Sequence, residues 1–140
     1  MEEEICRIEA QINKKNRAAC ILYPDRVVIR NHCDGGLMPV FDNRERVIPL
    51  DRILSVVISK GGVRLLVHHP NCIQFRTDKN VRTVDELFRD RSFHTSEYID
   101  EGVCQFAPRT EEELEQKLET ARRIKEYIES YQREHSASKE

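Results

Sequence analysis

The stretch Arg46–Ser59 (RVIPLDRILSVVIS) decides the fold, because it has the pattern of two β-strands joined by a short turn. Pro49 closes the first extended piece, and Asp51-Arg52 provides the turn. The second piece is rich in β-branched aliphatic residues, which suit a pleated, half-buried surface. Its alternation with serine and valine predicts one shared face for Leu54, Val56 and Ile58.

Further strand patterns flank this stretch on both sides. They predict an antiparallel meander of about seven strands with short turns. Lys60-Gly61-Gly62 is expected to form a tight hairpin turn, with glycine supplying a positive φ. The flanking strands are predicted at 6–12, Ala18–Tyr23, Arg26–Arg30, Val63–His68, Cys72–Thr77 and Val103–Ala107.

Residues 111–134 carry the clearest helix pattern in the chain. Thr110-x-x-Glu113 has the form of a capping box, which marks a helix start. Apolar residues then recur at steps of three and four and form one continuous stripe. The stripe predicts a C-terminal amphipathic helix that packs on the sheets, and residues 135–140 are expected to fray. The stripe consists of Leu114, Leu118, Ala121, Ile124, Ile128 and Tyr131.

Composition limits the class of protein. A chain of 140 residues with a net charge of −2 is expected to form a single domain, at 1–134, without global attraction for nucleic acid. No apolar run is long enough for a membrane span, and the first residues do not resemble a signal peptide. Five scattered cysteines without a C-x-x-C pair indicate reduced thiols, so a cytoplasmic location is expected.

Three segments together resemble the pleckstrin-homology-like (PH-like) superfold, most closely its bacterial PH-like and GRAM-type members. They are the strand-turn-strand Ala19–Asn31, the central stretch Arg46–Ser59, and the helix that follows Pro108. The chain departs from eukaryotic PH domains in lacking tryptophan, and its insertion at 78–102 is longer than the simple pattern. The resemblance implies an α+β fold, an antiparallel barrel or sandwich closed by one C-terminal helix. A plain antiparallel α+β sandwich is the alternative.

The resemblance also implies a candidate site for anionic lipid headgroups. Lys14, Lys15 and Arg17 lie at the first hairpin loop, where phosphoinositide-binding PH domains place basic residues. Phosphate capture requires several cations that converge on one pocket. An ordinary solvated turn is the alternative interpretation.

Two further segments are candidates for binding a protein partner. The loop 31–45 carries exposed or folded-back apolar residues at Leu37, Met38 and Phe41. Tyr127 and Tyr131 lie one turn apart near the end of the helix, where they either complete the core stripe or form an interface anchor. The insertion 78–102 is a second candidate docking loop.

The sequence contains no recognisable catalytic or cofactor motif. It has no phosphate-binding glycine loop, no G-x-S-x-G and no H-E-x-x-H. His68-His69-x-x-Cys72 lacks a second ligand pair, so we expect no metal site and no cofactor. The sequence therefore predicts a non-catalytic module that binds a protein partner, or a second copy, through loops or a sheet edge. Anionic-lipid binding is the main alternative, and an enzyme without a visible signature is the third.

Overall fold

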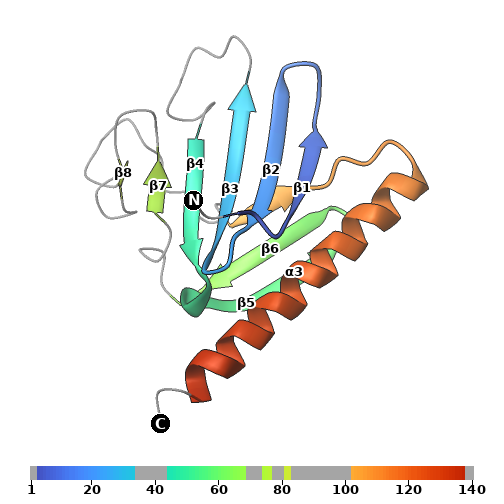
Figure 1. Ribbon diagram of the computed structural model, residues 1–140. Coiled ribbons are helices and arrows are strands. Elements are labelled where there is room, and N and C mark those ends of the chain that lie inside the picture. Colours follow the sequence, from blue (N-terminus) through green and yellow to red (C-terminus); the bar gives the residue numbers. More distant parts are fainter. Residues whose placement is uncertain (1–2, 34–43, 69–73, 77–80, 83–101, 138–140) are drawn as a thin grey trace.

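Two antiparallel β-sheets and one long C-terminal helix form the architecture (Figure 1). The computed structural model describes residues 3–33, 44–68, 74–76, 81–82 and 102–137. The first sheet has the strand order β1-β2-β3-β4-β7-β8, and the second has the order β5-β6-β9. The elements are β1 (Cys6–Gln11), β2 (Asn16–Leu22), β3 (Arg26–Cys33), β4 (Arg44–Pro49), the 3-10 turn η1 (Leu50–Arg52), β5 (Ile53–Ser59), β6 (Gly62–Val67), β7 (Gln74–Arg76), β8 (Val81–Arg82), β9 (Val103–Gln105) and α3 (Glu111–Ala137).

The α+β class with antiparallel sheets and a C-terminal helix is confirmed. The two sheets share no strand, so the described strands do not close into a barrel. The strand β8 lies within the region predicted as an insertion, and it has only two residues. The loop predicted at 31–45 is shorter than expected, because β3 continues to Cys33 and β4 begins at Arg44.

The central stretch forms β4, η1 and β5 and carries the chain from the first sheet to the second. The predicted shared face of Leu54, Val56 and Ile58 is wrong at Leu54. The register of β5 against β6 shifts between Ile53 and Ser55, so that Leu54 is 60% exposed. A β-bulge of this kind adds one residue and turns the side chains that precede it to the other face. Ile53 therefore takes the buried position that alternation assigned to Leu54.

One hydrophobic core lies between the two sheets and the helix. It includes Ala18, Cys20 and Leu22 of β2 from the first sheet, with Ile8 and Ala10 of β1 beside them, and Val56, Val63 and Leu65 from the second. The helix contributes Ala121, Ile124 and Ile128, which are all buried. Burial of this apolar surface is the main force that holds helix and sheets together. A smaller apolar cluster of Ile21, Val28 and Val47 lies on the opposite face of the first sheet.

Glycine has a different role in the β5–β6 hairpin from the one expected. The predicted positive φ is wrong, since neither Gly61 nor Gly62 adopts the left-handed conformation. Gly62 is instead required by close packing: a Cβ atom there would lie 2.4 Å from the carbonyl oxygen of Cys104. Gly102 is similar, with a Cβ position 2.3 Å from the carbonyl oxygen of Leu65. Both glycines let the backbones of β6 and β9 approach each other.

The predicted capping box is present at the start of α3. The Glu113 backbone N–H donates to Thr110 Oγ1 at 3.0 Å, and the Glu113 carboxylate accepts from the Arg109 backbone N–H at 2.9 Å. The first bond satisfies one of the N–H groups that a helix start leaves without an intrahelical partner, and the second joins Glu113 to the residue before the Thr110 cap.

Replacing Thr110 with alanine is expected to lower the free energy of unfolding by about 1 kcal/mol, because the cap loses its acceptor. Thr120→Ala is the matched control: the Thr120 hydroxyl donates to the carbonyl of Gln116 within the helix, and alanine is a better helix former. Urea denaturation followed by circular dichroism measures both changes. Equal effects for the two variants would contradict the assigned cap.

The helix ends later than predicted. It continues to Ala137, so the expected fraying of residues 135–137 is wrong. The His135 ring stacks on Tyr131, with ring centroids 3.7 Å apart. Gln132 Nε2 donates to the carbonyls of Leu50 and Ile53, at 2.9 and 2.6 Å. The last turns of the helix are therefore fixed to the η1 turn between the two sheets.

Candidate functional site

Strand β1 forms one edge of the first sheet, with β2 as its only neighbour among the described strands. The Ile12 N–H donates to the Asn16 carbonyl at 2.9 Å, which marks this pair as hydrogen-bonded. Hydrogen-bonded pairs alternate along an antiparallel ladder, so the even-numbered residues of β1 bond to β2. Arg7, Glu9 and Gln11 consequently direct their backbone N–H and C=O groups away from the sheet.

A groove of about 790 Å³ opens along this edge. Residues of β1–β3 bound it on one side, and the segment before α3 with the first two turns of the helix bounds it on the other. Four of the lining residues are alanines, whose small side chains leave the space open. The lining residues are Arg7, Glu9, Ala10, Gln11, Arg17, Ala18, Ala19, Arg30, His32, Ala107, Arg109, Glu113, Gln116 and Lys117.

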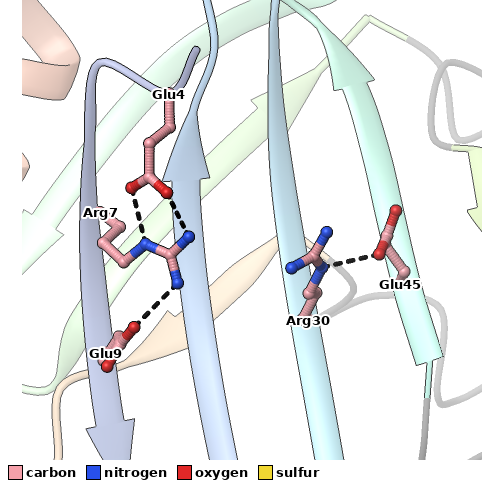
Figure 2. A network of polar contacts seen from close by, with 5 residues as sticks. All are labelled: Glu4, Arg7, Glu9, Arg30 and Glu45. Carbon is pink, nitrogen blue, oxygen red and sulfur yellow. Dashed lines mark hydrogen bonds and ion pairs between the residues drawn. The ribbon is translucent and has the colours of Figure 1, made fainter. Parts of the chain in front are cut away.

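Ion pairs organise the sheet side of the groove (Figure 2). Arg7 bonds to both oxygens of Glu4 and to Glu9, while Arg30 pairs with Glu45 at 2.7 Å. The hydrogen bond from Arg7 lowers the pKa of the Glu4 carboxyl, and the same contacts raise the pKa of Arg7. Exposed pairs of this kind add little stability. They do hold the charges of Arg7 and Arg30 next to carboxylates.

The helix side of the groove carries more positive than negative charge. Lys117 Nζ donates to the carbonyl of Phe106 at 2.5 Å, a neutral acceptor that leaves the ammonium charge in place. The Arg109 guanidinium is exposed and forms no ion pair within the described part of the chain. The carboxylate of Glu113 is already engaged by the Arg109 backbone N–H. Two cations therefore face the groove here against one carboxylate, so the net charge of this wall is positive.

The structure separates the basic residues that the sequence grouped together. Arg17 lines the groove, whereas Lys14 and Lys15 are exposed in the β1–β2 turn and do not line it. The predicted partner residues Leu37, Met38 and Phe41 lie outside the described residues. Tyr127 and Tyr131 pack against the core, and the Tyr127 hydroxyl donates to the Pro24 carbonyl at 3.0 Å. These two contacts match the core alternative for the tyrosines.

The buried thiols are not placed for nucleophilic chemistry. Burial raises the pKa of Cys104 to about 11 and raises that of Cys20 well above its ordinary value, so both stay protonated near neutral pH. The neighbouring Arg46, a charged side chain that is itself only 2% exposed, acts in the opposite direction but does not overcome burial. Within the described ranges, no three histidine, cysteine or acidic side chains gather into a possible metal site. Similarly, no helix in the described part is both long and apolar enough to cross a membrane.

Comparison with known proteins gave no match to a family model, a curated protein or a solved structure. The site therefore rests on geometry alone.

Of the residues that the sequence analysis proposed for an anion site, only Arg17 lines the groove, and the other lining residues were not proposed as a site. In the sequence, Arg7, Glu9 and Gln11 alternate with apolar residues, which predicts that they form the solvent-facing side of the first strand, and their exposure confirms this. The alternation could not show that this strand is an edge, or that Arg109 and Lys117 lie opposite. The spacing Arg109-x7-Lys117 at a helix start does not by itself predict a binding site.

Proposed function

We propose that the protein is a non-catalytic, PH-like binding module, and that it binds an extended segment of a protein partner along the β1 edge. The observation that carries this proposal is the groove of about 790 Å³ beside a strand with outward backbone groups. Two antiparallel sheets followed by a C-terminal helix are what the PH-like assignment requires at the level of fold class. The proposal includes a cytoplasmic location, because the five cysteines are scattered and form no C-x-x-C pair.

Strand addition is the binding mode that best fits this geometry. An extended segment gains main-chain hydrogen bonds from an open sheet edge, and pockets for alternate side chains provide specificity. The six residues of β1 span about 20 Å, enough to pair with a short segment. The opposite wall, formed by the start of α3, would enclose the segment on its second side.

The alternative of anionic-lipid binding has less support from the geometry. It needs Lys14, Lys15 and Arg17 to converge on one headgroup. Only Arg17 lines the groove, while the two lysines are at the tip of the turn.

A proline scan of the β1 edge tests the proposal. The binding peptide is first selected from a displayed library of random peptides. Glu9→Pro removes an outward N–H without removing a bond to β2, and proline is tolerated on edge strands in that orientation. We expect Glu9→Pro to weaken the selected peptide at least about tenfold, the worth of roughly one to two hydrogen bonds. Isothermal titration calorimetry measures the affinity.

Glu9→Ala is the matched control, since it removes the same carboxylate but keeps the N–H, and it should bind normally. Gln11→Pro repeats the test if Glu9→Pro does not fold. Hydrogen exchange gives the second readout: bound peptide should slow exchange at the amides of Arg7, Glu9 and Gln11. A library without binders, or peptides that protect only other amides, would overturn the proposal.

A further inference from the structure

We infer that the segment bound at the β1 edge is acidic, with carboxylate side chains that contact Lys117 and Arg109. This inference rests on the proposed function and specifies its partner. It follows from the direction of side chains in an added strand and from the charges on the helix wall.

An added strand divides its side chains between the two faces of the sheet. In β1 the even-numbered residues, such as Ile8 and Ala10, belong to the core that also contains the apolar residues of α3. The even-numbered face is therefore the face on which the helix lies. Because side chains alternate along a strand, every second residue of an added segment points to this same face. Those residues meet the start of α3.

The side chains at the start of α3 that line the groove are mainly cationic. Lys117 and Arg109 line the groove, and neither is paired with a carboxylate of the described residues. Glu113 also lines it, and its carboxylate keeps its charge because its partner is the neutral Arg109 backbone N–H, so the helix wall holds two cations against one anion. Glu111 and Glu112 occupy the same helix turn and are exposed, yet they are not among the lining residues.

The opposite wall does not cancel this excess. Arg7 and Arg30 are held by Glu4, Glu9 and Glu45, so their charges are largely compensated. Arg17 also lines the groove. The whole chain carries a net charge of −2, so the positive groove is a local feature and not a reflection of overall composition. Charge complementarity of this kind selects partners and speeds their association.

Three synthetic peptides test the inference: acetyl-(Thr-Glu)4-amide and its glutamine and lysine counterparts. Each peptide can pair with β1 in two registers that differ by one residue, and one of them directs its glutamate, glutamine or lysine side chains toward α3. We expect the glutamate peptide to bind at least about tenfold more tightly than the glutamine peptide, with the lysine peptide weakest. Affinity of the glutamate peptide should fall as salt rises, because partly exposed charges are screened.

The double variant Lys117→Gln/Arg109→Gln should remove the preference for glutamate and leave the glutamine peptide unchanged. Glutamine at 117 keeps an N–H donor for the Phe106 carbonyl, so the fold is preserved. The matched control is Arg122→Gln/Lys125→Gln, which makes the same charge change in a part of α3 that does not line the groove.

The outcomes separate the two proposals. If library-selected peptides protect the Arg7, Glu9 and Gln11 amides but the glutamate and glutamine peptides bind equally, the acidic partner is wrong and strand addition stands. If no peptide protects those amides, strand addition itself fails. Vesicles of phosphatidylcholine with phosphatidylserine form a third arm. Binding that depends on Lys14 and Lys15, and not on Lys117 and Arg109, would overturn the inference in favour of a lipid surface.

Discussion

Gly62→Ala will lower the free energy of unfolding by about 2–3 kcal/mol, the upper part of the range for an overpacked core position. The added Cβ atom would lie 2.4 Å from the Cys104 carbonyl oxygen and 3.1 Å from the Gln105 Cα. Both contacts are with backbone, which cannot move aside as a flexible side chain does. The strain is relieved only if β6 and β9 separate, which would weaken their pairing.

Gly61→Ala is the control in the same turn. Its nearest neighbour would be Ser59 Oγ at 3.8 Å, an ordinary contact, and the residue does not need a positive φ. We expect this variant to be as stable as the parent or slightly more stable, since alanine restricts the unfolded chain. Urea denaturation gives both values. Equal losses at the two positions would show that the hairpin, and not the approach of β9, requires glycine.

Alkaline pH will destabilise the protein through its buried thiols. Burial raises the pKa of Cys104 to about 11 from an ordinary value of 9.0. Between these two values the unfolded chain loses the thiol proton while the folded chain retains it. The unfolded state then binds fewer protons, so stability falls as pH rises. Two units correspond to about 3 kcal/mol for Cys104, and Cys20 shifts in the same direction.

The difference between parent and Cys104→Ala isolates this effect from the other groups that titrate at high pH. Unfolding free energies measured from pH 8 to about pH 11 should converge as pH rises, because the variant has no thiol to ionise at this position. The variant starts lower, since a side-chain contact in the core is lost. Parallel curves for the two proteins would contradict the burial of Cys104.

The accuracy of sequence reasoning differed between elements for physical reasons. The start of α3 was predictable because its signals are local: Thr110, Glu113 and the apolar stripe all lie within a few turns. The strands were located by alternation, which is also local. Leu54 was misassigned because a bulge depends on the partner strand and leaves no mark in the strand's own sequence.

The groove was beyond sequence reasoning for a related reason. Its walls come from β1 and from α3, which are about a hundred residues apart in the chain. Arg17 was identified because clustered basic residues are visible locally. Arg109 and Lys117 can be identified as groove residues only when the start of α3 is known to lie opposite an edge strand. The need for glycine at position 62 was also not predictable, since the backbone that it contacts, at Cys104, lies far along the chain.

The hydrogen bonds from Gln132 to the Leu50 and Ile53 carbonyls can form only late in synthesis, because Gln132 lies near the end of α3. All strands precede α3 in the chain, so they leave the ribosome before the helix that covers their shared core. Until residues 121–132 emerge, the corner between the two sheets lacks its covering helix, and the apolar residues beneath it stay accessible to chaperones and to neighbouring chains. At that stage the chain already contains every described strand but lacks the Gln132 bonds to the turn between the two sheets.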